Sequence, residues 1–213
     1  MKLGLKAKIQ IRDILVPPHY SADITAGSLL IHESKKTASL LLTDLSPTEI
    51  RKKVVEENLF QKRSPKTSAR QCRLILNRLT LMNPDILPMI SEGDYQLSTQ
   101  AILSCAVKQN RLLGDFMLKV IGSRIRIIDN RLSKRDWEKF LEACELIDPQ
   151  ISRFAESTRK KLKQIVFRIL VEAKYLESRK SPKLTPVRIE PQLRSYLVKN
   201  EEKYVLSCLE VYK

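Results

Sequence analysis

The most regular hydrophobic periodicity in this sequence lies in RKKLKQIVFRILVEA, residues 159–173. Its inward-facing residues are spaced at i, i+3, i+4, i+7, i+8 and i+11, the pattern of one buried helix face: Leu162, Ile165, Val166, Ile169, Leu170 and Ala173. Shorter helical patterns begin at Ser46-Pro47 and Ser64-Pro65, where serine suits the N-cap and proline the first turn. We therefore predict a mainly α-helical protein, a compact multi-helix bundle.

The segment that follows this helix has a different pattern. Residues 179–191 contain three prolines and the alternating apolar residues Leu184, Val187 and Ile189, which is typical of a loop with one or two short strands. A helix over 157–176 followed by such strands is similar to a winged-helix element, whose recognition helix docks in the major groove. We predict a small, wing-like β-hairpin near residues 180–190.

This pattern divides the chain into three predicted parts. Residues 1–22 form a basic N-terminal arm, and residues 23–130 form an N-terminal helical lobe. Residues 131–213 form a C-terminal helical lobe that carries the winged-helix-like element.

Composition narrows the classes of function. The 213 residues are 43% hydrophobic and 30% charged, which is globular composition. Lys and Arg total 39 against 24 Asp and Glu, giving a net charge of +15. Such a field attracts polyanions, with nucleic acid as the first candidate and an anionic membrane surface as the second. With 5 glycines, a glycine-rich phosphate-binding loop is not expected.

The sequence does not predict an enzyme, a metal site or a cofactor. The two histidines, His19 and His32, lie far in sequence from any carboxylate cluster, and no nucleotide-binding, hydrolase or metalloprotease motif is present. The cysteines lack the close spacing of a zinc site: Cys72, Cys105, Cys144 and Cys208. We expect buried free thiols; two disulfides in an oxidising compartment are the alternative. Without a signal peptide or a long apolar run, we expect a cytoplasmic protein that makes no membrane contact.

Positive charge is concentrated in two clusters. Residues 58–84 contain no acid, and Lys66, Arg70 and Arg73 are spaced to share one helix face. Cations in the first turns of the helix over 157–176 oppose the helix dipole, so their placement favours a functional interpretation. A solvated helix face is the alternative for both. The predicted nucleic-acid-binding residues are Lys62, Arg63, Lys66, Arg70 and Arg73 (the N-terminal basic cluster) and Arg159, Lys160, Lys161 and Lys163 (the C-terminal basic cluster).

Beyond these patterns, the chain resembles the BrxA family, small accessory proteins of bacterial BREX phage-defence systems. The resemblance covers most of residues 25–211 and is carried by VVEENLFQKRSPKTSARQCRLILNRL (54–79), QAILSCAVKQNRLLGDF (100–116), LSKRDWEKFLEACELIDPQISRFAESTRKKLKQIVFRILVEAKYLES (132–178) and LTPVRIEPQLRSYL (184–197). It implies an all-helical fold similar to that of NusB antitermination factors, and nucleic-acid binding without catalysis. It also implies partners within a multi-protein system that contains a methyltransferase, an ATPase and a phosphatase-like protein.

Together these features predict a non-catalytic accessory protein that binds double-stranded DNA. RNA binding by a NusB-like factor, or a scaffold role within the defence complex, is the alternative. Aromatic content is 6%, with one tryptophan, Trp137, on an apolar helix face, so a base-stacking platform is not expected. No extended heptad repeat is present, and we expect a monomer.

Overall fold

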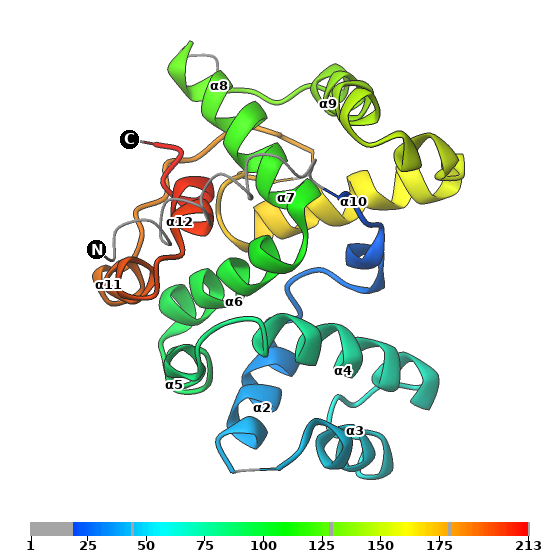
Figure 1. Ribbon diagram of the computed structural model, residues 1–213, viewed down its shortest axis with the longest axis vertical. Coiled ribbons are helices and arrows are strands. Elements are labelled where there is room, and N and C mark those ends of the chain that lie inside the picture. The colour runs from blue at the N-terminus through cyan, green and yellow to red at the C-terminus, as the bar shows by residue number, and fades with distance from the viewer. Residues whose placement is uncertain (1–18, 44, 128–129, 179, 213) are drawn as a thin grey trace, which may run out of the picture.

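The computed structural model describes residues 19–43, 45–127, 130–178 and 180–212. This part of the chain is mainly helical and contains no sheet, which confirms the predicted fold class (Figure 1). The resemblance to NusB in particular stays a prediction. The α-helices are α2 (Ile31–Leu41), α3 (Pro47–Glu56), α4 (Pro65–Leu79), α5 (Leu87–Ser91), α6 (Tyr95–Gln109), α7 (Arg111–Asp115), α8 (Gly122–Arg126), α9 (Lys134–Ile147), α10 (Glu156–Glu172), α11 (Pro191–Lys199) and α12 (Lys203–Leu209).

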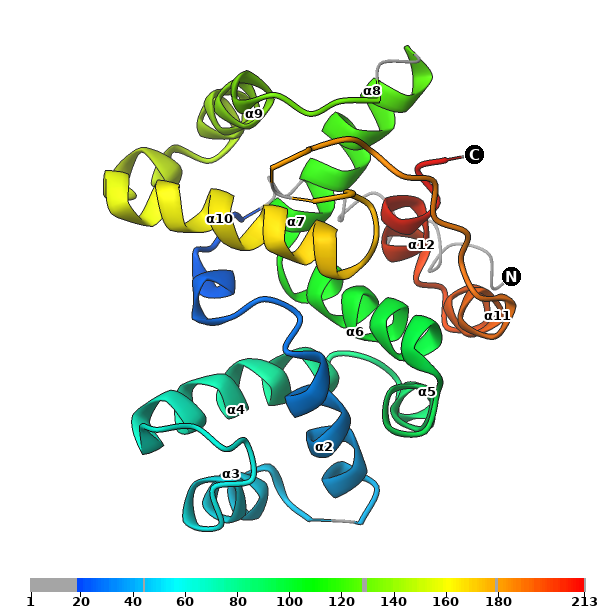
Figure 2. The same ribbon diagram turned by 180° about the vertical axis from the view of Figure 1, so that it is seen from behind.

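The helices pack around a central axis formed by α6 and by three short helices that follow it in a continuous column. Helices α2, α3 and α4 form one end of the molecule (Figure 1). Helix α6 contacts α2, α4 and α5 as well as α11 and α12. The column consists of α7, the π-helical η3 (Phe116–Ile121) and α8. A short 3₁₀ helix, η1 (Asp23–Ala26), leads the chain between α10 and α4 (Figure 2).

Local capping fixes where several helices begin. The hydroxyl of Ser46 accepts the Glu49 N–H at 3.3 Å while the Glu49 carboxylate accepts the Ser46 N–H at 2.8 Å, a complete capping box. Ser133 and Asp136 form a second box at the start of α9. The position of Ser46 as an N-cap confirms the sequence prediction. Ser64 also precedes its helix as predicted, but its side chain makes no capping hydrogen bond.

Aromatic side chains join α9 and α10 to the central column. The ring of Phe116 lies 5.2 Å from those of Trp137 and Phe140, and 6.0 Å from that of Phe167. Trp137 is 2% exposed, so it is a core residue, as the sequence indicates. The four cysteines are also buried and free, as predicted, and burial raises the pKa of the Cys72 and Cys144 thiols to about 11.

One buried carboxylate connects the two ends of the described chain. The side chain of Asp115 accepts the hydroxyl protons of Tyr20 and Tyr204, each at 2.8 Å. Arg111 and Lys119 each lie 2.9 Å from its carboxylate oxygens, and both are one helical turn from Asp115. A carboxylate that is 0% exposed is stable in its charged form because these donors replace its hydration.

The predicted wing-like β-hairpin at residues 180–190 is wrong. Lys183 and Leu184 form isolated bridges with Arg131 and Leu176, respectively, and the chain beyond them runs along α6 instead of turning back. There, the Gln100 amide donates to the Arg188 carbonyl, and the Glu190 N–H donates to the Gln100 Oε1, both at 2.8 Å. Prolines at 182, 186 and 191 lack the N–H that a strand ladder needs, which explains why no hairpin forms.

Two predictions concern regions that the structure describes incompletely. Most of the predicted basic arm, residues 1–18, lies outside the described residues, and the division into two lobes stays a prediction. Across the described ranges, no helix combines the length and apolar composition needed to cross a bilayer.

Candidate nucleic-acid interface

A cleft of about 660 Å³ lies where the α2–α4 end of the molecule meets α10. The loop residues of the η1 segment form part of its lining. Its charged side chains come from distant parts of the sequence: Lys62, Arg70, Lys161 and Arg168, with the acids Glu33 and Glu172. The fold therefore brings members of both basic clusters to one place.

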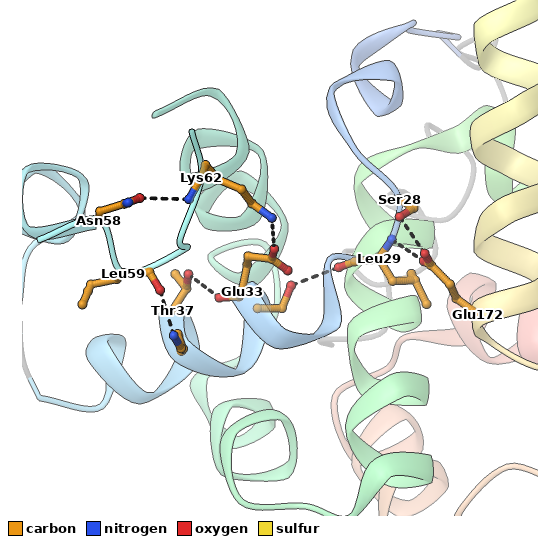
Figure 3. Close-up of polar contacts among 10 residues, drawn as sticks. Ser28, Leu29, Glu33, Thr37, Asn58, Leu59, Lys62 and Glu172 are labelled. Atoms are coloured by element: carbon orange, nitrogen blue, oxygen red, sulfur yellow. Dashed lines mark hydrogen bonds and ion pairs between the residues drawn. The ribbon is translucent and has the colours of Figure 1, made fainter. Parts of the chain in front are cut away.

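Lys62 is held at one side of this cleft by the loop between α3 and α4. Its backbone N–H donates to Asn58 Oδ1 at 2.9 Å, and its ammonium lies 2.5 Å from Glu33 Oε1 (Figure 3). Asn58 and Gln61 have φ angles of 46° and 52°, in the left-handed region, which makes the loop tight. Lys62 is thus a paired residue, and its side chain is 29% exposed.

Glu172 fixes the opposite side of the cleft to the segment that enters α2. Its carboxylate accepts the Ser28 hydroxyl at 2.8 Å and the Leu29 N–H at 3.0 Å (Figure 3). Arg168 Nε donates to the same carboxylate at 2.8 Å. These contacts use Glu172 and Arg168 to join α10 to the N-terminal segment.

Five of the predicted site residues are exposed and, within the described part of the chain, have no ion-pair partner: Arg63, Lys66, Arg70, Arg73 and Lys161. Lys66, Arg70 and Arg73 lie on one face of α4 and are named the α4 stripe here. Arg70 connects the stripe to the cleft because it also lines the cleft wall. The first turn of α4 contains no acid, so the positive end of the helix dipole is not offset there.

The C-terminal basic cluster is divided between two faces of α10. Arg159 pairs with Glu145 and donates to the carbonyls of Ile151 and Phe154 at 3.1 and 3.2 Å, a structural role. Lys160 lies 2.7 Å from Glu156, and Lys163 lies 3.6 Å from Glu138. Lys161 alone of this cluster lines the cleft. Arg159, Lys160 and Lys163 instead line a second cavity between α9 and α10, together with Glu138, Glu142 and Glu156. The structure therefore separates Lys161 from the other three members of the cluster.

Arg168 and Glu33 are cleft residues that the sequence interpretation did not include. A signal for Arg168 was available, because Lys161, Ile165, Arg168 and Glu172 follow at i, i+4, i+7 and i+11 and all line the cleft. No comparable pattern marks Glu33, whose carboxylate meets Lys62 through the tertiary fold.

The described residues contain no group of three or more His, Cys, Asp or Glu side chains arranged to hold a metal ion. The cleft has four cationic side chains and two carboxylates, and its ammonium and guanidinium groups, on both sides, are of the kind that bind anions.

Comparison with known proteins places this geometry in a family context. The sequence model of the BrxA family matches residues 18–201. A "BREX protein BrxA" of Paramagnetospirillum magneticum is 39% identical over 197 residues, covering 92% of this chain and 99% of that protein. Another from Escherichia coli is 24% identical over 188 residues, covering 88% of each. The crystal structure of an uncharacterized protein from Magnetospirillum magneticum is 38% identical, with a TM-score of 0.84 over 91% of this chain and 100% of that chain.

Proposed function

The chain belongs to the BrxA family, and from that premise we propose that it is a non-catalytic accessory component of a BREX phage-defence system that binds double-stranded DNA. Its relatives carry the name BREX protein BrxA, so other BREX proteins are its proposed partners.

The observation that supports DNA binding is the pairing state of the basic residues. Among the predicted site residues, those of the α4 stripe, Arg63 and Lys161 are exposed without an ionic partner in the described residues. From Lys66 to Arg73 the stripe extends about 10 Å along the helix, at roughly 1.5 Å per residue. Phosphates on one strand rise by about 3.4 Å each, so this length matches several consecutive backbone groups.

The proposed docking surface is α4 and the mouth of the cleft, not α10 inserted into the major groove. Helix α10 buries its apolar face, and three of the four members of its basic cluster pair with glutamates. The predicted wing is also missing from the described residues. Arginine and lysine contacts to phosphates position a protein on DNA without reading its sequence. We therefore propose binding with little sequence preference.

A band-shift titration tests this proposal. Duplex DNA, single-stranded DNA and RNA of matched sequence are titrated with the full chain over a range of salt concentrations. If the five unpaired cations each contact a phosphate, log affinity falls against log salt with a slope of about −4.5. R70E/R73E is expected to weaken duplex binding and reduce the slope by about 2.

The matched control is K160E, which changes an exposed α10 lysine that already pairs with Glu156. It is expected to leave duplex affinity within a factor of a few of the wild type. Tighter binding to RNA than to duplex would favour the RNA-binding alternative. No binding to any of the three at low salt would favour the scaffold.

A further inference from the structure

We propose that the cleft between α4 and α10 binds a nucleoside phosphomonoester, either a free mononucleotide or the 5′-phosphorylated end of a nucleic-acid strand. The strand-end source rests on the proposed function, whereas the free-nucleotide source does not.

The charges that line the cleft fit a dianion. Lys62 is matched by Glu33, and Arg168 by Glu172, which leaves Arg70 and Lys161 without ionic partners in the described residues. A phosphomonoester carries about −1.5 to −2 charges at pH 7, because its second pKa is about 6. An internal phosphodiester, which lacks this second ionisation, carries a single charge. The uncompensated charge of the cleft is therefore better matched by a terminal phosphate than by an internal one.

The two free cations come from different elements. Arg70 lies on α4 and Lys161 on α10, and both border the same cleft. Like charges that share a partly enclosed space repel each other unless an anion compensates them. A phosphate that contacts both would also link the α2–α4 end of the molecule to α10.

The cleft is larger than a phosphate group, so its volume indicates a ligand that carries further atoms. Its volume of about 660 Å³ lies within the range of about 300–1,000 Å³ that is common for small-molecule sites. Phosphate alone would leave most of this space to water, since one water occupies about 30 Å³. A duplex is wider than its major groove, which is about 12 Å across, so only the terminal nucleotide of a strand can enter the cleft. The dimensions therefore fit one nucleotide.

The remaining lining suits a nucleoside. Leu30, Ile31 and Ile165 supply apolar surface on which a sugar and a base can pack. Gln71 also lines the cleft, and its Oε1 is buried without a hydrogen-bond partner among the described residues. The amino groups of adenine, cytosine and guanine are donors that can satisfy such an oxygen.

Isothermal titration of the full chain tests the site directly. Adenosine 5′-monophosphate is expected to bind at least 10-fold more tightly than adenosine, which lacks the phosphate, and than ribose 5-phosphate, which lacks the base. R70A and K161A are each expected to weaken adenosine 5′-monophosphate binding at least 5-fold. Both residues are exposed, so the variants should fold, which thermal melting verifies. R73A, which removes a stripe residue that does not line the cleft, should leave nucleotide binding unchanged.

A second comparison identifies the source of the phosphate. Duplexes that differ by a 5′-phosphate or a 5′-hydroxyl are tested as competitors of adenosine 5′-monophosphate. Stronger competition by the phosphorylated duplex supports the strand end, and equal competition alongside tight nucleotide binding supports the free nucleotide. Equal affinity for ribose 5-phosphate, or no binding of the nucleotide together with no end preference, would overturn the proposal. Because R73A separates duplex affinity from cleft occupancy, either proposal can fail while the other stands.

Discussion

The guanidinium of Arg78 is buried and donates through Nη1, at 2.6 Å, to the carbonyl oxygen of Ser28, a residue that lines the cleft. Its Nε donates to Gln109 Oε1 at 3.0 Å, so one side chain joins α4, the segment before α2, and the end of α6. Burial lowers the pKa of Arg78 to about 10, which still leaves it charged at neutral pH. Arg78 is thus a structural residue, although it lies in the acid-free segment 58–84 that also carries the N-terminal basic cluster.

Replacing Arg78 is expected to reduce stability without affecting the DNA surface. R78A removes the donor of three hydrogen bonds, to the carbonyls of Gly27 and Ser28 and to Gln109 Oε1, and leaves a cavity. This should lower the free energy of unfolding by about 3 kcal/mol. R73A, an exposed neighbour on α4, should change stability by less than about 0.5 kcal/mol. Urea denaturation measures both. Equal stability of the two variants would contradict the structural role.

Two serines at helix starts provide a matched pair. S46A removes the capping box of α3 and should cost about 1 kcal/mol. S64A occupies the same position before α4, where no capping hydrogen bond forms, and should cost little. The two midpoints of urea denaturation test this difference, and a larger loss for S64A would show that α4 is capped in solution.

The buried carboxylate predicts a pH-dependent stability. Burial by itself would raise the pKa of Asp115, but hydrogen bonds from Lys119, Tyr20 and Tyr204 and the charge of Arg111 lower it overall. Because the folded-state pKa lies below the unfolded value of about 3.9, the ionised group stabilises the fold above that pH, and the contribution is lost as pH falls through the folded pKa. D115N should therefore cost about 3 kcal/mol at pH 7 and less at pH 3.5. Urea unfolding at both values measures the difference, and a cost independent of pH would rule out this linkage.

The burial of the single tryptophan predicts that nucleic acid will not change the fluorescence of the protein. Trp137 is 2% exposed and packs against Phe116 and Phe140. Acrylamide should quench its fluorescence weakly, and saturating single-stranded DNA should leave its emission unchanged, because no base can stack on a buried ring. Strong quenching by single-stranded DNA would place Trp137 in the binding surface instead.

Local features such as helix starts could be predicted from the sequence. The tertiary contacts of each segment could be predicted less well. Ser46 could be predicted as a helix start because a cap involves residues only three positions apart in the sequence. The spacing of Leu184, Val187 and Ile189 predicted short strands, and that prediction was wrong because the segment packs along α6 instead. Gln100 of α6 satisfies the backbone of that segment, so no second strand is needed.

The same limit applies to the candidate site. The basic residues could be located from the sequence, but their availability depends on acids brought near by the fold. Arg159 is neutralised by Glu145 of α9, whereas Lys161, two residues later, lines the cleft with Arg70. Neither relationship follows from helical spacing within one segment, because the pairing crosses between helices.

The shared carboxylate of Asp115 also has a consequence for the order in which the protein can be made. Tyr204 lies 89 residues after Asp115, so a ribosome synthesises this donor about 4–18 s later, at roughly 5–20 residues per second. Until α12 has left the exit tunnel, the carboxylate lacks one of its two hydroxyl donors. The hydrogen bonds of this buried carboxylate are therefore completed only after α12 has emerged, and a chain that stops before Tyr204 lacks one of them at the centre of the molecule.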